Sequence, residues 1–363
     1  MTTINEIFRT FAPEYLERYA EAMPKAHRKV IHAMIACRTQ ASGVVIYECE
    51  KCGQVHRVYR SCGNRHCPTC QHHKTQQWLD KQLKRQLPGH HFMLTFTVPE
   101  SLRRFIRNNQ SVAYSALFKA SSEAIKKLAL DQHYIGGDLP GFFGVLHTWG
   151  RTLEFHPHIH YIVPGGAVST SDGLWHPSRA DFYLPVQALS VIFKAKFRDA
   201  IKNAGLFDQI PSEVWQIDWN VNSQAVGSSH ASLIYLAPYV FRVAISNSRI
   251  LKVENRTVFI RYRKSHSRRL RTLALEVMEF TRRFLQHVLP TGFMKIRYYG
   301  FMNPSCAVSL DHVSSLIELS HGFNVPLPNT DLEPWQPITC PTCGGTLRLR
   351  SLLLPANVLV WSG

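Results

Sequence analysis

Two pairs of cysteines within the first 70 residues restrict the local fold more than any other feature of the sequence. Cys49 and Cys52 form one Cys-x2-Cys pair, and Cys67 and Cys70 form a second one after fourteen intervening residues. Each pair can present two thiolates from one tight turn, and two such turns can complete the tetrahedral shell that zinc prefers. Gly53 suits such a turn. We therefore expect a structural Zn²⁺ bound by Cys49, Cys52, Cys67 and Cys70.

Other potential ligands leave the exact composition of this site open. His56, Cys62 and His66 lie inside the same window. One of them could replace a cysteine or help to hold a second ion, and all three are equally compatible with residues that bind no metal. A further pair, Cys340-x2-Cys343, fits half of a zinc site as well as it fits a turn without metal. The sequence alone favours neither interpretation of this pair.

The hydrophobic pattern between residues 89 and 221 predicts an α+β fold. Strands and helices are expected in the order β-α-β-β-α-β, the split-βαβ arrangement of ferredoxin-like and RRM-like sheets. Strands are expected at residues 90–98, 142–149, 154–163 and 213–221, and helices at residues 100–130 and 186–205. In this arrangement the third strand lies centrally in an antiparallel sheet, beside the first.

Helices and a hairpin are expected outside this region. Residues 1–40 have helical spacing with a break near Pro24. Short strands that alternate with Cys-Gly turns are expected at residues 44–70, and a polar helix is expected at about residues 71–87. A hairpin is expected at residues 250–263, turning at residues 254–256, and a basic helix from about Arg268 to Val288.

The expected third strand contains the segment FHPHIHYIV, with three histidines at alternate positions. Side chains at i and i+2 of a strand share one face, so His158 and His160, about 6.8 Å apart, can converge on one metal ion. His156 shares this face but lies about 13 Å from His160, so it could join them only through a bulge at Pro157. Taken alone, the pattern more often marks core or surface histidines.

Two tyrosines follow in the segment ASLIYLAPYVFR, seventy-five residues beyond His160. On a helix, Tyr235 and Tyr239 would share one face about 6 Å apart, so both phenols could reach one site. Pro238 between them requires that the helix starts or kinks there. The alternative interpretation is a pair of core tyrosines on an amphipathic helix.

The charge balance favours a polyanionic partner. Lys and Arg number 42 against 25 Asp and Glu, a formal charge of +17, which points first to nucleic acid and second to an anionic membrane. A basic run, RYRKSHSRRLR, could contact a phosphate backbone or be an ordinary solvated face. Its candidate DNA-binding residues are Arg261, Arg263, Lys264, Arg268, Arg269 and Arg271.

Together these features resemble a known family. The zinc-binding N-terminal region, HTWGRTLEFHPHIHYIVPGG, YLAPYVFRVAISNSRI and IRYYGF occur in this order between about Tyr47 and Phe301. They resemble rolling-circle transposases of the insertion-sequence ninety-one family, which are two-tyrosine members of the HUH endonuclease superfamily. The resemblance implies a helical and zinc-binding DNA-binding domain at residues 1–88 and an HUH catalytic domain at residues 89–303. Residues 304–363 are expected to form an irregular tail.

The resemblance also implies a chemistry. In the family, the HUH histidines hold Mg²⁺ or Mn²⁺, and a tyrosine attacks a phosphodiester of single-stranded DNA at the ends of the element. The products are a 5′-phosphotyrosine and a 3′-hydroxyl. His158 and His160 match the metal-binding pair, and Tyr235 and Tyr239 match the nucleophiles. The order of attack by the two tyrosines is open.

A third metal ligand is expected because HUH sites usually use three side chains. His147 is the first choice, because in an antiparallel hairpin it would lie opposite or diagonal to residues 156–158. The register is not fixed by the sequence, and a slip of one residue would turn His147 to the other face. The alternatives are His156, Gln224 and His230.

Two other functions remain as alternatives: a rolling-circle plasmid replication initiator, and a non-catalytic zinc DNA-binding protein in which the histidines and tyrosines belong to the core. A mobilisation relaxase is disfavoured, because relaxases generally place the tyrosine before the histidines. The sequence lacks a basic-then-apolar signal pattern and any apolar run of about eighteen residues. We therefore expect a cytoplasmic bacterial protein that works at the nucleoid.

Overall fold

The computed structural model describes residues 2–228, 230, 233–234, 244–264, 269–322 and 338–354. The chain forms two compact units, each built from separate segments. Unit 1 combines Met1–Lys74 with Phe241–Val288 and Asp331–Gly363, and unit 2 combines Thr75–Val240 with Leu289–Thr330.

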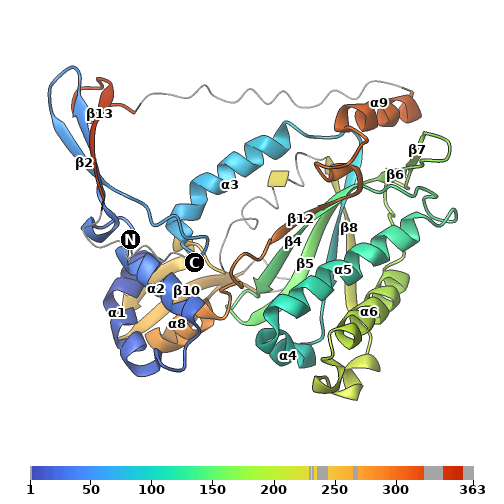
Figure 1. Cartoon of the computed structure of the whole chain (residues 1–363), viewed down its shortest axis with the longest axis horizontal. Helices are drawn as coiled ribbons and strands as arrows, with labels where there is room; N and C mark the ends of the chain where they lie inside the picture. Colours follow the sequence, from blue (N-terminus) through green and yellow to red (C-terminus); the bar gives the residue numbers. More distant parts are fainter. Residues whose placement is uncertain are drawn as a thin grey trace. The chain divides into compact units, whose positions relative to one another are not determined.

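Unit 2 is built on a five-stranded antiparallel sheet (Figure 1). Its strands are β3 (His90–Thr97), β4 (Phe142–Trp149), β5 (Phe155–Pro164), β8 (Asn220–Ser228) and β12 (Ile296–Tyr299). The strand order is β12-β4-β5-β3-β8, so the histidine-containing strand β5 lies between β4 and β3. The α+β class and the central position of this strand are thereby confirmed, with β12 added at one edge.

Three helices cover one face of this sheet (Figure 1). They are α4 (Arg103–Asn108), α5 (Gln110–Ala129) and α6 (Val186–Asn203). Along β5, the side chains at odd positions from Phe155 to Val163 are buried against these helices, as in the 2.7 Å contact of the Tyr161 hydroxyl with the hydroxyl of Ser121 on α5. Because successive side chains of a strand alternate between faces, the even-numbered histidines lie on the other face of the sheet.

Smaller elements complete unit 2. The helix α3 (Pro68–Leu83) passes from unit 1 into unit 2, where Trp78 contacts Phe143 and donates a 3.1 Å hydrogen bond to the Tyr298 hydroxyl. Strands β6 (Gly166–Val168) and β7 (Trp175–Pro177) form a small hairpin, which packs with α9 (Leu310–His321) in a separate apolar cluster. Part of the expected irregular tail is therefore helical.

The segment expected to form a strand at residues 213–221 differs from the prediction. It starts with a 3₁₀ turn (Ser212–Trp215) after Pro211, and β8 begins only at Asn220. The physical reason is the packing of Trp219, whose buried ring contacts Phe193 and Phe197 of α6 while its indole N–H donates to the carbonyl of Val214. This hydrogen bond from Trp219 back to Val214 requires a turn between the two residues rather than an extended chain.

Unit 1 contains the helices α1 (Ile4–Tyr19), α2 (Lys25–Ala36) and α8 (Val277–Leu285). The break near Pro24 is confirmed. A capping box starts α1, where Thr3 and Glu6 satisfy each other's backbone N–H groups. The rings of Phe8 and Phe284 pack edge to face, 5.1 Å apart, in the core between α1 and α8.

A second sheet of unit 1 contains β9 (Ile250–Glu254), β10 (Thr257–Arg263) and β11 (Leu270–Glu276). The expected hairpin is β9–β10. The basic helix expected from about Arg268 was wrong in its first part, because residues 270–276 form β11 and the helix α8 begins only at Val277. Strand pairing with β10 stabilises the extended form, and Glu276 then caps α8 by accepting hydrogen bonds from two backbone N–H groups.

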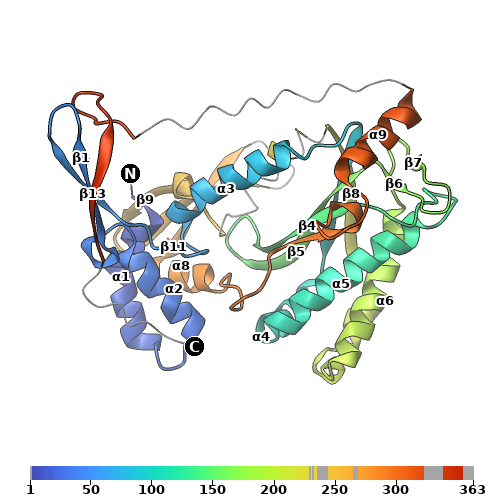
Figure 2. The ribbon, with the colours of Figure 1, turned by 45° about the horizontal axis from the view of Figure 1, so that its top comes forward.

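A third sheet brings distant segments together. Its strands are β1 (Val44–Cys49), β2 (Val55–Tyr59) and β13 (Leu347–Leu353), with β1 in the middle. Figure 2 labels β13 beside β1. The contacts therefore divide the chain differently from the expected domains, since β13 pairs with β1 and α8 packs against α1. Across the residues that the structure covers, no helix combines the length and apolar character needed to cross a membrane.

Candidate metal and catalytic site

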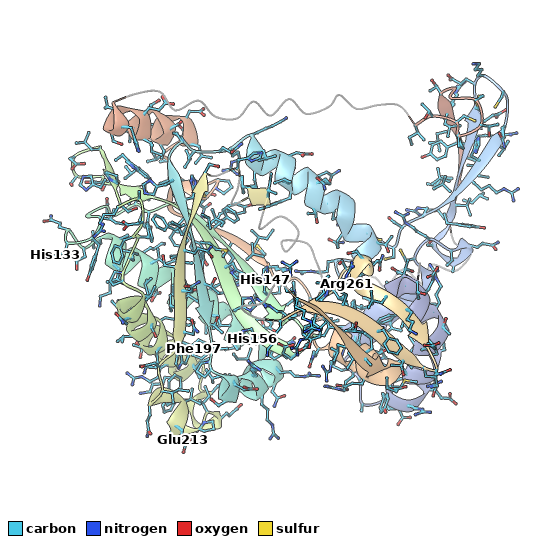
Figure 3. The ribbon with its side chains drawn as sticks, turned by 180° about the vertical axis from the view of Figure 1, so that it is seen from behind. His133, His147, His156, Phe197, Glu213 and Arg261 are labelled. Atoms are coloured by element: carbon cyan, nitrogen blue, oxygen red, sulfur yellow. The ribbon has the colours of Figure 1, made fainter. Side chains whose placement is uncertain are left out.

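Three histidines converge on the face of the unit 2 sheet that lies opposite α4, α5 and α6. His147 on β4 is the direct cross-strand partner of His158 on β5, and His160 follows two positions further along β5. The potential ligand atoms of His147, His158 and His160 all lie within 4.8 Å of one another. Figure 3 labels His147 and His156 on the sheet and Phe197 on α6. The register thus turns His147 toward the pair on β5, as three ligands of one ion require.

The three rings pack edge to face around a common point. Ring centroids are 4.8 Å apart for His158 and His160, 5.2 Å for His147 and His158, and 4.7 Å for His147 and His160. The ring of His147 also stacks on that of Trp149, and Nζ of Lys295 lies 4.7 Å from the centre of the Trp149 ring. This packing holds the imidazoles in a fixed mutual orientation.

Hydrogen bonds select the nitrogens that face the common point. The Nδ1–H of His158 donates to the carbonyl of His156 at 2.7 Å, and Nδ1 of His160 lies 2.8 Å from the hydroxyl of Thr95 on β3. In metal sites such contacts to one ring nitrogen fix the tautomer and leave the other nitrogen to ligate. Nε2 is therefore the ligating atom expected for both residues.

Burial keeps these imidazoles in the ligating form. It lowers the pKa of His158 well below its usual value and the pKa of His160 to about 4, with the neighbouring histidines adding to the effect. Both side chains are therefore neutral near pH 7, and a neutral imidazole is the form that binds metal ions.

The alternative third ligands do not join this group. Nδ1 of His156 accepts a 2.7 Å hydrogen bond from Arg103, and burial lowers the pKa of His156. Gln224 lies on β8, where it pairs with Met93 of β3. Strand β3 therefore separates Gln224 from the histidines of β5. Among the residues that the structure describes, the metal-ligand group on this sheet consists of His147, His158 and His160 without His230.

The predicted nucleophiles, Tyr235 and Tyr239, lie outside the described residues, as does Arg268. The other predicted DNA-binding residues are exposed and flank the β10–β11 connection: Arg261, Arg263, Lys264, Arg269 and Arg271. Arg271 pairs with Tyr262, whereas Arg261 pairs with Thr272. Because alternate residues face opposite sides, Arg261 and Arg263 share one side of the hairpin and Arg271 lies on the other.

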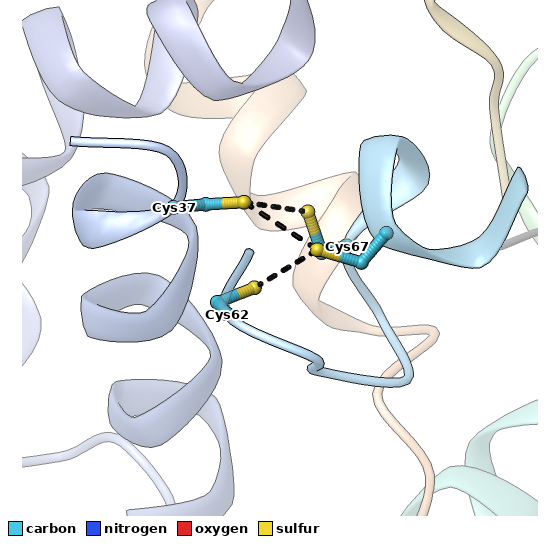
Figure 4. Close-up of side chains that lie close together, drawn as sticks. Cys37, Cys62 and Cys67 are labelled. Carbon is cyan, nitrogen blue, oxygen red and sulfur yellow. Dashed lines mark hydrogen bonds between the residues drawn. The ribbon is translucent and has the colours of Figure 1, made fainter. Parts of the chain in front are cut away.

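The predicted zinc ligands are divided between two clusters. Cys67 and Cys70 lie with Cys37 and Cys62, with sulfur–sulfur distances of 3.4 Å for Cys37–Cys70 and 3.5 Å for Cys62–Cys70 (Figure 4). Thiolates around a tetrahedral zinc, at about 2.3 Å each, are about 3.8 Å apart. This cluster therefore fits Zn²⁺.

Cys49 and Cys52 lie instead with Cys340 and Cys343, so the expected single shell of Cys49, Cys52, Cys67 and Cys70 is not formed. The residues between the two Cys-x2-Cys pairs include β2, which runs antiparallel along β1 and so leads away from Cys49. A strand of six residues is about 20 Å long. Cys62 and the second pair therefore lie near the opposite end of β1 from Cys49.

The sequence pattern did not assign Cys37 or Cys62 to the zinc shell. Cys37 follows the last residue of α2 and is fully buried, and no second cysteine near it in the sequence marks it as a ligand. The available signal was the cysteine count of nine, which suffices for two four-cysteine sites with Cys306 left over. Neither His56 nor His66 belongs to a four-cysteine group.

Comparisons with known proteins agree with these two kinds of site. A family model described as "Putative transposase" matches residues 141–309, which include the three histidines, and one described as "Transposase zinc-binding domain" matches residues 7–98. The match to the second model and the cysteine clusters support Zn²⁺ binding by this chain.

Two curated relatives cover most of the chain. A protein of Sinorhizobium fredii named "Putative transposase y4qJ" is 32% identical over 91% of this chain and 87% of its own length. A protein of Pseudomonas savastanoi pv. phaseolicola named "Transposase for insertion sequence element IS801" is 27% identical over 88% of this chain and 82% of its own length. No solved structure matches the chain.

Proposed function

The chain belongs to the insertion-sequence ninety-one family of transposases with an N-terminal zinc-binding domain, and from this premise we propose that it nicks and rejoins single-stranded DNA. The substrate would be the ends of an insertion sequence, cut and joined in rolling-circle transposition. The observation that carries the proposal is the convergence of His147, His158 and His160 on one face of the sheet.

His147, His158 and His160 would hold a divalent ion, because three converging imidazoles, two of them oriented by hydrogen bonds, form a suitable donor set. Once bound, this ion would supply Lewis-acid polarisation of the scissile phosphate. Imidazole nitrogens suit transition metals better than Mg²⁺. Of the two ions expected, we therefore favour Mn²⁺ for tighter binding.

Tyr235 and Tyr239 are the proposed nucleophiles. The phenolate oxygen of one tyrosine would attack the phosphorus and form a bond to it. The phosphate would stay on the 5′ end of the downstream strand, which becomes linked to the protein. The bond from phosphorus to the 3′ oxygen breaks, and this oxygen leaves as a 3′-hydroxyl after taking up a proton. The second tyrosine would allow a second cleavage, so that strand transfer and rejoining use the same chain. The basic residues of β10 and β11 would contact the DNA backbone.

The test uses single-stranded oligonucleotides that contain the end of the element, each labelled at one terminus. An oligonucleotide labelled at its 3′ end should transfer the label to the protein in a denaturant-resistant adduct. The same oligonucleotide labelled at its 5′ end should release a free labelled fragment. The opposite labelling pattern would exclude a 5′-phosphotyrosine.

Variants connect this adduct to the proposed residues. The Tyr235→Phe, Tyr239→Phe double variant should form no adduct, whereas Tyr134→Phe, at an exposed tyrosine, should react like the parent protein. A chelator that removes divalent ions should stop cleavage. DNA binding without any adduct in the parent protein would favour a non-catalytic zinc DNA-binding protein, and cleavage that survives chelation would contradict the metal-dependent mechanism.

A further inference from the structure

The second four-cysteine cluster joins segments that are almost 300 positions apart. The sulfur atoms of Cys49 and Cys343 are 3.5 Å apart, and those of Cys52 and Cys340 are 3.9 Å apart. All four sulfurs lie within 4.8 Å of one another. A disulfide requires about 2.05 Å between its sulfurs, whereas these distances match four thiolates around one tetrahedral zinc.

The two halves of the cluster have the same local geometry. Gly53 N–H donates to the carbonyl of Cys49 at 2.9 Å, and Gly344 N–H donates to the carbonyl of Cys340 at 2.8 Å. Both glycines have positive φ, +69° and +71°, which glycine adopts without strain. Each Cys-x2-Cys pair is therefore folded into a tight turn that presents its two sulfurs in one direction.

The surrounding residues fit a built site. A Cβ atom on Gly345 would lie 2.6 Å from the Cβ of Lys51 and 3.1 Å from the sulfur of Cys49, so only glycine lets the two turns approach this closely. Nε2 of His56 lies 3.3 Å from the sulfur of Cys340. Such contacts to a ligand from outside the metal shell are typical of zinc sites and orient the ligand.

The sheet beside the cluster has little other support. Strand β13 pairs with β1 along its whole length, with Leu353 opposite Val44 at one end and Leu347 opposite Cys49 at the other. No residue of β13 is fully buried, and four of the five residues of β2 are exposed. A small sheet without a core usually depends on a metal or a covalent crosslink.

We propose that Cys49, Cys52, Cys340 and Cys343 bind a second structural Zn²⁺, which fastens residues 338–354 to the β1–β2 hairpin. Two of these ligands lie far outside the matched zinc-binding domain at residues 7–98. The zinc-binding region of this protein is thus completed by a segment that follows the clustered histidines by about 180 positions. All four ligand positions are filled by cysteines, which leaves no position for chemistry.

The experiment measures zinc in the purified full chain by mass spectrometry of the metal. The parent protein should contain about two zinc ions per chain, and Cys340→Ser, Cys343→Ser should contain about one. Cys306→Ser, outside both clusters, should keep both ions. A parent protein with one zinc that the double variant retains would overturn the proposal, and so would two ions in both proteins.

A second measurement covers the case in which the double variant folds poorly. Cys343→His replaces one zinc ligand by another, so it should keep both ions and fold, while Cys343→Ala should lose one ion. Amide hydrogen exchange should then increase within residues 44–49 and 347–353 of Cys343→Ala and stay unchanged in β10 and β11. Unchanged exchange throughout would show that the strand pairing does not need the metal.

Discussion

Each of the three clustered imidazoles is held by a different neighbour. His158 is fixed by a backbone carbonyl of its own strand, His160 by a hydroxyl of the adjacent strand, and His147 by stacking on Trp149. The supports come from three different chain segments, so the orientation of the ligands depends on the sheet rather than on a loop. Sites on rigid elements position their ligands more accurately than sites on loops.

The choice of third ligand is testable by comparing two histidine variants. His147→Ala removes a member of the cluster and should reduce adduct formation by more than about 100-fold. His156→Ala removes a residue that contacts Arg103 and should leave at least about a tenth of the activity. Cleavage of the labelled oligonucleotide as a function of Mn²⁺ concentration measures both effects. If His156→Ala were the more damaging change, the assignment of His147 would be contradicted.

Acid sensitivity is expected from a histidine outside the cluster. His91 on β3 is fully buried, and burial lowers its pKa to about 4 from an ordinary value near 6.5. The unfolded chain therefore binds this proton at a higher pH than the folded protein does. The stability that the neutral, buried His91 allows is fully present above pH 6.5. As the pH falls toward 4, the free energy of unfolding decreases by up to about 3 kcal/mol because of this group.

His91→Leu should flatten this part of the pH profile of unfolding. Within the described structure, Nε2 of His91 has no hydrogen-bond partner, and Nδ1 lies 3.3 Å from the carbonyl of Gly89. An apolar residue of similar size therefore removes the titration at the cost of this one contact, which lowers stability equally at both pH values. Urea unfolding at pH 7 and pH 4.5 measures the difference, with the exposed His133→Leu as the control. An equal loss of stability in acid for parent and variant would exclude His91 as the cause.

At the level of elements, the sequence predicted β3, β4, β5 and the helices on their far side, because strict alternation and long helical periodicity are local signals. It did not predict β11, since LRTLALE has apolar residues that fit both periods and only pairing with β10 decides. The start of β8 depended on the packing of Trp219 against α6. Tertiary contacts, invisible in a single segment, determined both.

The same limit applies to the sites. His158 and His160 share a strand, so their common face could be predicted, whereas His147 required the register between β4 and β5. The cysteine grouping failed for a similar reason. Cys37 and Cys343 come from segments whose proximity to the central pairs follows only from the assembled unit.

The contact between β4 and β5 contains a position that should accept no side chain. A Cβ atom on Gly144 would overlap the ring of Tyr161, its cross-strand partner. The Tyr161 side chain is fully buried, and its hydroxyl lies 2.7 Å from the Ser121 hydroxyl, so the ring cannot easily move away. Gly144→Ala should therefore lower the free energy of unfolding by about 1–3 kcal/mol. Urea unfolding measures this loss.

The overlap can be relieved by shortening the partner. Gly144→Ala combined with Tyr161→Leu should be destabilised by less than the sum of the two single variants, because the leucine makes room for the added methyl group. Additive losses would show that the close approach of glycine and ring is not the reason for the effect.

At the level of the whole molecule, the charge of +17 predicts DNA binding that weakens strongly with salt. Each phosphate contact on a single strand contributes about 0.7 to the slope of log affinity against log salt. The triple variant at Arg261, Arg263 and Arg271 should lower this slope by about 2, measured by fluorescence anisotropy with single-stranded DNA.

A matched control separates local contacts from total charge. It removes three arginines that are each paired with a carboxylate, namely Arg18, Arg179 and Arg282. This control loses the same net charge but should retain most of the slope, because paired arginines release fewer counterions from DNA. Equal slopes for the two triple variants would mean that the β10–β11 hairpin is not a specific phosphate contact.

The pairing of β13 with β1 has a consequence for biosynthesis. Residues 44–49 leave the ribosome long before residues 347–353, at about 5–20 residues per second. During this interval, which lasts tens of seconds, one edge of β1 is not yet paired with β13. The thiols of Cys49 and Cys52 likewise lack Cys340 and Cys343. A copy of the element with a late frameshift would leave them permanently exposed, so its product should be prone to aggregation and proteolysis even with an intact histidine cluster.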